Sequence, residues 1–228
     1  MGRRRDVDRF DRWAETYDQH WMQRAIFEPV QGTVLELAEQ EIPRPGAILD
    51  VGCGTGRLLR LAEARFPGAV VSGVDAAPRM VDQAQAALVE GSRIAVQQAI
   101  AEDLPFPDAR FDLVFSTLTF HHWGDQQRAV KEIARVLAPG GRWLLAEFLA
   151  TGFMRYVRRL LRMKRFPVRE SLDALLAVAG LRILAERRVS GLHGQVAVLV
   201  IGAHELATPA GRHSDQTTRW AGHTRKAP

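Results

Sequence analysis

The stretch AILDVGCGTG at residues 47–56 decides the fold, because it joins an apolar run of strand length directly to a glycine-rich turn. Glycine occurs at positions 52, 54 and 56, and residues 57–65 then show the apolar spacing of a helix. Glycine lets the backbone turn tightly and approach a ligand, and the first turn of a helix offers free N–H groups to it. The spacing is G-x-G-x-G, with Arg57 where the dinucleotide pattern G-x-G-x-x-G requires glycine. The stretch therefore predicts a ligand-binding strand-turn-helix unit within an α/β sheet.

Strand and helix patterns alternate on both sides of this unit. Apolar residues at helical spacing fill residues 13–40. Strands are expected at 70–75, 94–97, 111–116 and 143–148, helices at 78–89 and 125–137, and a turn at 139–141. Alternation of this kind predicts a mainly parallel sheet with helices on both faces.

The last two predicted strands must pair differently. They occupy residues 181–189 and 195–203, follow a helix at 168–179, and are separated by only residues 190–194. So short a connection allows only antiparallel pairing.

The composition is that of one globular domain. The chain has 228 residues, of which 46% are hydrophobic and 25% charged. Its single cysteine, Cys53, excludes an internal disulfide and a Cys-x-x-Cys metal site, and no metal site is predicted. No run reaches the roughly 18 apolar residues of a membrane span, and the N-terminal sequence is charged, so a cytoplasmic location is expected.

The net charge of +5 is unevenly distributed. Residues 1–12, 151–170 and 206–228 carry +2, +6 and +3, which leaves −6 for the rest of the chain. An acidic core with basic appendages weakens the case for a nucleic-acid groove, so nucleic acid is not an expected partner.

Asp75 ends the predicted second strand, 19 residues after the last glycine of the turn. A carboxylate at that position can accept hydrogen bonds from both ribose hydroxyls of an adenosine-containing cofactor. An NAD-dependent oxidoreductase is the competing enzyme class, although Arg57 and the antiparallel strand pair argue against it. If Asp75 binds no ligand, it is instead a solvated loop carboxylate or the N-cap of the helix that begins at Pro78.

Four ordered motifs resemble those of class I S-adenosylmethionine-dependent methyltransferases. They are ILDVGCGTG at 48–56, GVDAAPRM at 73–80, AEDLPFPD at 101–108 with FDLV at 111–114, and EIARVLAPGGR at 132–142. The similarity covers about residues 10–205 and is greatest to the small-molecule group that includes the ubiquinone/menaquinone C-methyltransferases. It implies a Rossmann-like, doubly wound, seven-stranded sheet of order 3-2-1-4-5-7-6, with the last strand pair antiparallel. The implied cofactor is S-adenosylmethionine, with S-adenosylhomocysteine as its product.

The resemblance implies a role for each matching residue. The glycine turn would pack against the methionine part of the cofactor, with Asp50 near its amino group and Asp75 on the ribose. Met80 and Leu104 would flank the adenine, and Tyr17 resembles a lid tyrosine of the family. The implied cofactor-binding set is Tyr17, Asp50, Gly52, Cys53, Gly54, Gly56, Asp75, Ala76, Met80, Ala101, Glu102, Asp103, Leu104 and Ser116.

The chain departs from the family at residues 99–101, which read Ala-Ile-Ala where members usually have Gly-Asp-Ala. In the family that aspartate lies near the adenine amino group. Either Glu102 or Asp103 takes over this hydrogen bond, or backbone groups at Ala101 suffice.

Candidates for a catalytic base lie at the carboxyl ends of predicted strands. Methyl transfer from a sulfonium is an in-line displacement, so a base is needed only where the acceptor must lose a proton. His121 and His122 follow the fourth strand, and His193 lies between the last two strands. We expect the base among these three histidines and favour His122; the alternative is that they pack the loop or cap the helix near Asp125. Glu147, at the end of the fifth strand, is interpreted first as structural and second as substrate-binding.

Residues 153–166 show a basic amphipathic pattern, with apolar residues on one helical face and arginines on the other. A lid over the pocket is favoured. The alternative is transient contact with an anionic membrane surface, which would suit a quinone-like or lipid-like acceptor.

The predicted organisation is a helical lid region at 1–42, a methyltransferase core at 43–205 with a basic helical insertion at about 151–167, and a disordered tail at 206–228. The predicted function is O- or C-methylation of a small-molecule acceptor, aromatic, quinone-like or lipid-like. The competitor from another class is a non-catalytic cofactor-binding protein or a membrane-peripheral adaptor.

Overall fold

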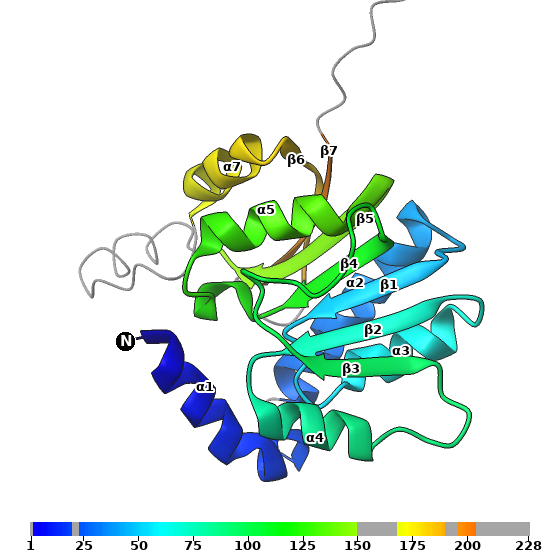
Figure 1. The fold of residues 1–228 in the computed structure, drawn as a ribbon. Helices are drawn as coiled ribbons and strands as arrows, with labels where there is room; N and C mark the ends of the chain where they lie inside the picture. The colour runs from blue at the N-terminus through cyan, green and yellow to red at the C-terminus, as the bar shows by residue number, and fades with distance from the viewer. Residues whose placement is uncertain (1, 20–22, 150–167, 190–195, 204–228) are drawn as a thin grey trace, which may run out of the picture.

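The computed structural model describes residues 2–19, 23–149, 168–189 and 196–203, and within them seven strands form one sheet (Figure 1). The strands are β1 (Ala47–Val51), β2 (Val70–Asp75), β3 (Ile94–Gln98), β4 (Phe111–Thr117), β5 (Leu137–Phe148), β6 (Leu181–Arg188) and β7 (Val196–Ala203). Their order is β3-β2-β1-β4-β5-β7-β6, and β7 runs antiparallel to both β5 and β6 while the other neighbouring pairs are parallel. The predicted fold class and strand order are confirmed.

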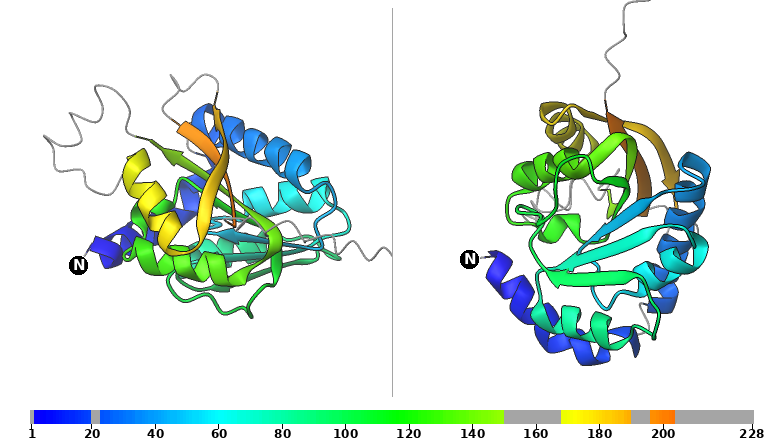
Figure 2. Two further views of the ribbon diagram at one scale, coloured as in Figure 1. Left: turned by 90° about the horizontal axis from the view of Figure 1, so that it is seen from above. Right: turned by 45° about the vertical axis from the view of Figure 1, so that its right-hand side comes forward.

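Helices cover both faces of the sheet (Figure 2). On one face lie α2 (Glu28–Glu41), α3 (Arg57–Arg65) and α4 (Pro78–Ala86), and on the other α5 (Gln126–Val136) and α7 (Arg169–Val178). Before α2 come α1 (Gly2–Trp13), a 3-10 helix η1 (Ala14–Gln19) and a π-helical turn η2 (Gln23–Phe27). A short 3-10 helix, η3 (Phe120–His122), follows β4.

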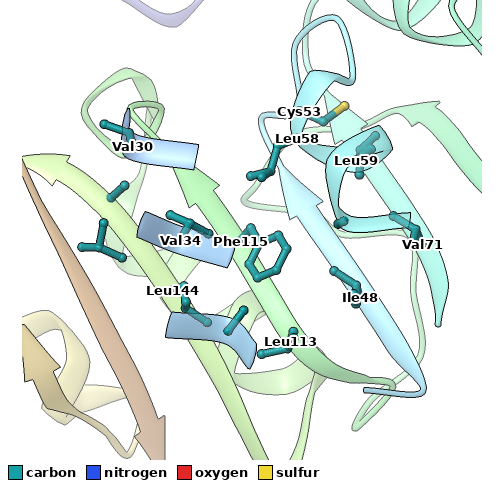
Figure 3. Close-up of a cluster of buried hydrophobic side chains, with 14 of the residues drawn as sticks. Val30, Val34, Ile48, Cys53, Leu58, Leu59, Val71, Leu113, Phe115 and Leu144 are labelled. Carbon is teal, nitrogen blue, oxygen red and sulfur yellow. The ribbon is translucent and has the colours of Figure 1, made fainter. Parts of the chain in front are cut away.

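Burial on both faces explains the nearly continuous apolar composition of the central strands. Side chains alternate along a strand, so Ile48 of β1 packs under α3 while Leu49 packs under α5. Figure 3 shows the first of these clusters, where Val34 of α2 and Leu58 of α3 lie over Phe115 of β4.

The structure corrects the predicted turn at residues 139–141, which lies inside β5. Residue pairing with β4 moves from Phe111–Leu137 to Leu113–Arg142, so the intervening residues bulge out of the ladder. Gly140 absorbs the bulge with a φ of 79°. Smaller differences are that α1 begins at Gly2 and that α4 ends at Ala86.

Several predictions concern residues outside the described ranges. They are the basic insertion at 151–167, the tail at 206–228 and His193, and these stay predictions. Within the described ranges, no helix combines the length and the apolar character needed to cross a bilayer.

Candidate functional site

A cavity opens at the carboxyl ends of β1, β2 and β4, where the strand order reverses. Its walls come from the turn after β1, the start of α4, the segments after β3 and β4, and α1. The lining residues are Val7, Phe10, Tyr17, Val51, Gly52, Gly54, Asp75, Ala76, Ala77, Met80, Ala99, Ile100, Ala101, Glu102, Thr117, Leu118, Thr119, His122 and Trp123. Mainly apolar walls with a few polar groups are typical of a small-molecule site.

The glycine turn is held against β2 by two backbone hydrogen bonds. The N–H groups of Gly52 and Cys53 donate to the carbonyl oxygen of Val74 at 2.8 and 3.0 Å. Gly52 has a φ of 83°, and a Cβ atom added there would lie 2.3 Å from Oγ1 of Thr119. Both the backbone conformation and the close approach of the segment after β4 therefore require glycine.

Substituting Gly52 by alanine is expected to weaken ligand binding in this cavity by about 10-fold, because the turn or Thr119 must move by more than an ångström. Gly91→Ala is the matched control: Gly91 has nearly the same φ, 82°, but nothing within 4 Å of the added Cβ. The measurement is ligand affinity together with the melting temperature of each variant. Equal effects of the two substitutions on affinity would contradict the expectation.

Asp75 is one of two carboxylates in the cavity wall, the other being Glu102. Its Oδ2 accepts a hydrogen bond from the N–H of Gly54 and its Oδ1 one from the N–H of Ala77, both at 2.9 Å. Burial raises the pKa of Asp75, while these backbone hydrogen bonds act in the opposite direction. One side chain thus fixes both the glycine turn and the start of α4.

Asp50 lies inside β1, one residue before the cavity wall begins at Val51. It is 1% exposed, and its Oδ1 atom has no hydrogen-bond partner. Burial, and next the negative charge of Asp75, raise the pKa of Asp50 to about 8. A buried carboxyl group with an unsatisfied oxygen suits a cationic ligand.

The N-terminal segment closes one side of the cavity with Tyr17. Its ring makes edge contacts with Trp13 and Phe27, at centroid distances of 5.4 and 5.8 Å. Burial, and then the charges of Asp75 and Asp18, raise the pKa of the Tyr17 phenol, so it stays protonated. The hydroxyl of Thr55 donates to Oδ1 of Asp18 at 2.7 Å, which ties η1 to the glycine turn.

Two adjacent histidines follow β4 in different surroundings. His122 lines the cavity, and its ring meets Phe10 edge-on at 4.9 Å. His121 lies behind it, with ring centroids 4.0 Å apart, and contacts Glu147 at the end of β5. Only His122 of the two is part of the cavity wall.

Comparison with known proteins agrees with this geometry. A family model described as a methyltransferase domain matches residues 49–145. A demethylmenaquinone methyltransferase from Thermus thermophilus is 32% identical over 202 residues, which are 77% of this chain and 87% of the relative. The chain belongs to the class I S-adenosylmethionine-dependent methyltransferases.

Other relatives are longer than the matched region. A malonyl-[acyl-carrier protein] O-methyltransferase from Geobacter sulfurreducens is 41% identical over 65% of this chain, but the match covers only 54% of that relative. Among solved structures, an S-adenosylmethionine-dependent methyltransferase from Aquifex aeolicus shares the fold, with a TM-score of 0.66 and 18% identity over 84% of this chain and 96% of the other.

The predicted cofactor-binding residues of this methyltransferase divide into two groups. Those in the cavity wall are Tyr17, Gly52, Gly54, Asp75, Ala76, Met80, Ala101 and Glu102. Those outside the wall are Asp50, Cys53, Gly56, Asp103, Leu104 and Ser116. Ser116 accepts a hydrogen bond from the indole N–H of Trp143 at 3.2 Å, and Leu104 is buried in the core beneath α5. These two side chains lie in the core behind the cavity wall and do not line the cavity.

The departure at residues 99–101 leaves an apolar wall in the methyltransferase cavity. Ile100 lines it at the position where the family usually has aspartate. Glu102 is buried, and its Oε1 accepts hydrogen bonds from the N–H groups of Gly124 and Asp125 at 2.9 and 3.0 Å. Asp103 is exposed and does not reach the wall. Of the two carboxylates considered for adenine, only Glu102 lies at the cavity.

The sequence analysis missed several residues of the wall. Thr117, Thr119 and Trp123 could have been found, because they directly follow the fourth strand at the ligand-binding edge. The sequence around Val7 and Phe10 does not indicate that these residues line the cavity, because their position at the cavity depends on how α1 packs against α4.

Proposed function

We propose that this methyltransferase binds S-adenosylmethionine in the cavity at the ends of β1, β2 and β4 and methylates a quinone-like small molecule. The observation that supports it best is one cavity that combines the glycine turn with a half-buried carboxylate, Asp75, at the end of the neighbouring strand. The name of the Thermus thermophilus relative supports a quinone-like acceptor.

The residues present fit the cofactor. The unsatisfied Oδ1 of Asp50 offers an acceptor to a cationic amino group. Gly54 leaves room for a methionine chain against the backbone, because the nearest atom to a Cβ added there is Cε1 of Tyr17 at 3.9 Å. In this proposal Asp75 accepts hydrogen bonds from the ribose hydroxyls and Met80 with Ala101 packs against the adenine, which is supported by the position of all three residues in the cavity wall. The bound cofactor would supply an electrophilic methyl group on a positively charged sulfur.

The protein contributes alignment, exclusion of water and a site for a proton. Phe10, Tyr17 and Trp123 surround the cavity with rings, which keeps water from the reacting atoms. His121 and His122 lie at the end of β4, where an acceptor would meet the cofactor, and His193 remains a candidate outside the described residues. An acceptor hydroxyl would pass its proton to one of these histidines.

Calorimetric titration with S-adenosylhomocysteine tests the proposal. We expect one molecule to bind per chain, and NAD, added to a parallel sample, to give no heat of binding. Binding of NAD alone would replace the proposal with the oxidoreductase alternative. Binding of neither would leave the fold with a degenerate site and favour the adaptor alternative.

A further inference from the structure

The order of the strands fixes the direction in which the proposed cofactor lies. The glycine turn follows β1, Asp75 ends β2, and residues 99–102 follow β3, which is next to β2 in the sheet (Figure 1). Asp75 pairs with Gln98 of β3, and the N–H of Ala99 donates to the carbonyl oxygen of Asp75 at 3.1 Å. A cofactor with its amino acid part at the turn and its ribose on Asp75 therefore has its base against the segment after β3.

The wall at this end of the cavity is apolar. It consists of Ala77 and Met80 at the start of α4 and of Ala99, Ile100 and Ala101 after β3, and we call these five residues the base end of the cavity. Met80 is 2% exposed, so its side chain is held in place by its neighbours. Such side chains give a flat ring a large contact area but offer its polar groups no strong hydrogen-bond acceptor.

Two backbone groups of the segment after β3 form hydrogen bonds within the protein. The N–H of Ala99 is bonded to Asp75, and the carbonyl oxygen of Ile100 accepts from the N–H of Asp103 at 3.1 Å. Of residues 99–101, only Ile100 has a side chain longer than a methyl group. The side chain at position 100 therefore decides what the segment presents to the edge of a base.

Glu102, the second carboxylate of the wall, is committed to the start of α5. Its side chain is buried, and its Oε1 accepts hydrogen bonds from the N–H groups of Gly124 and Asp125 at 2.9 and 3.0 Å. A carboxylate at the start of a helix is stabilised by N–H groups that the helix leaves unpaired. Turning Glu102 toward a ligand would break both hydrogen bonds, so this carboxylate holds the protein together and does not bind the base.

We propose that Ile100 makes this methyltransferase recognise the base of its cofactor by the shape of the ring and not by its 6-amino group. The inference rests on the proposed function and extends it to the selectivity of the same site. The 6-amino group of adenine meets an apolar side chain, and removing its N–H groups from water without a new acceptor is unfavourable. A purine that carries hydrogen at position 6 thus binds at least as well as adenine does.

Calorimetric titration of the full chain with two ligands tests this inference. One ligand is S-adenosylhomocysteine, and the other is its analogue with unsubstituted purine in place of adenine. We expect their dissociation constants to agree within about threefold, because the apolar side chains at the base end lose no hydrogen bond. A carboxylate acceptor would instead favour adenine by at least about 10-fold.

The same titrations separate failure of the inference from failure of the proposed function. A wild type that binds neither compound would refute the proposed function, and the inference would fall with it. A wild type that binds S-adenosylhomocysteine but prefers it to the purine analogue by more than about threefold would leave the proposed function standing and overturn the inference alone.

Ile100→Asp supplies the acceptor that the wild type lacks. Ile100 is half-buried, so a polar side chain at this position can keep contact with water. At pH 8, where the new carboxylate is ionised, we expect the variant to prefer S-adenosylhomocysteine over the purine analogue by at least about 10-fold. Ile100→Asn offers a neutral acceptor and should give a smaller preference of the same sign. Equal affinities for the two compounds in both variants would show that position 100 does not face the base, which overturns the inference.

The matched control is Ile183→Asp, which places the same charge at another half-buried isoleucine. Ile183 lies in β6, at the opposite end of the strand order from β3, and does not line the cavity. The ratio of the two affinities should stay as in the wild type, while the melting temperature reports any loss of stability. A change of the ratio as large as in Ile100→Asp would mean that general loosening causes it, which counts against the inference.

Discussion

Asp75→Ala is expected to weaken S-adenosylhomocysteine binding by at least about 100-fold. Hydrogen bonds to a charged group contribute roughly 1.5–3 kcal/mol each, and two ribose hydroxyls would lose their acceptor. The substitution also removes the acceptor of the Gly54 and Ala77 N–H groups, so the glycine turn in the cavity wall loses its support. Calorimetric affinity, with the melting temperature of the unliganded variant, measures both consequences.

Asp112→Ala is the matched control. Its Oδ2 accepts from the N–H groups of Gly46 and Ala47 at 2.7 and 3.0 Å, near the amino end of β4. It therefore removes two carboxylate–backbone hydrogen bonds far from the cavity and should lower stability without changing affinity. Affinity of Asp75→Ala within about threefold of the wild type would refute a ribose-binding role.

The sheet could be predicted from sequence because its determinants are local. Apolar runs at 47–51 and 70–75, each followed by a helix pattern, specify β1, β2 and their crossovers. The bulge in β5 could not be predicted, because a Pro-Gly-Gly sequence indicates a turn and only pairing with β4 shows that the strand continues through it.

Residues of the cavity wall could be predicted where one short segment carries both the fold and the wall positions. Gly52, Gly54 and Asp75 are of this kind, since the turn and strand that place them are local. The difference between His121 and His122 was not predictable, because it depends on Glu147, which is 26 residues away in the chain and joins His121 only across the sheet. Side-chain partners across strands are set by register, which sequence patterns constrain weakly.

Asp50→Asn is expected to change how stability depends on pH. Burial and the nearby Asp75 charge raise the pKa of Asp50 to about 8, whereas the unfolded chain titrates near its ordinary value of 3.8. Between these pH values the folded state binds more protons than the unfolded state, so rising pH lowers the free energy of unfolding. The asparagine variant lacks this titration, and above pH 8 it avoids a buried negative charge.

The measurement is urea unfolding of wild type and Asp50→Asn at pH 5 and at pH 8. The wild type should lose about 3 kcal/mol more than the variant over this interval, from the proton that Asp50 gives up. Asp75, whose pKa is also raised, keeps a residual dependence of the same sign in both proteins, so the difference between them isolates Asp50. Parallel pH dependences would show that Asp50 is ionised in the unliganded fold. A cationic cofactor would then find the carboxylate already charged, and its binding would release no proton from this site.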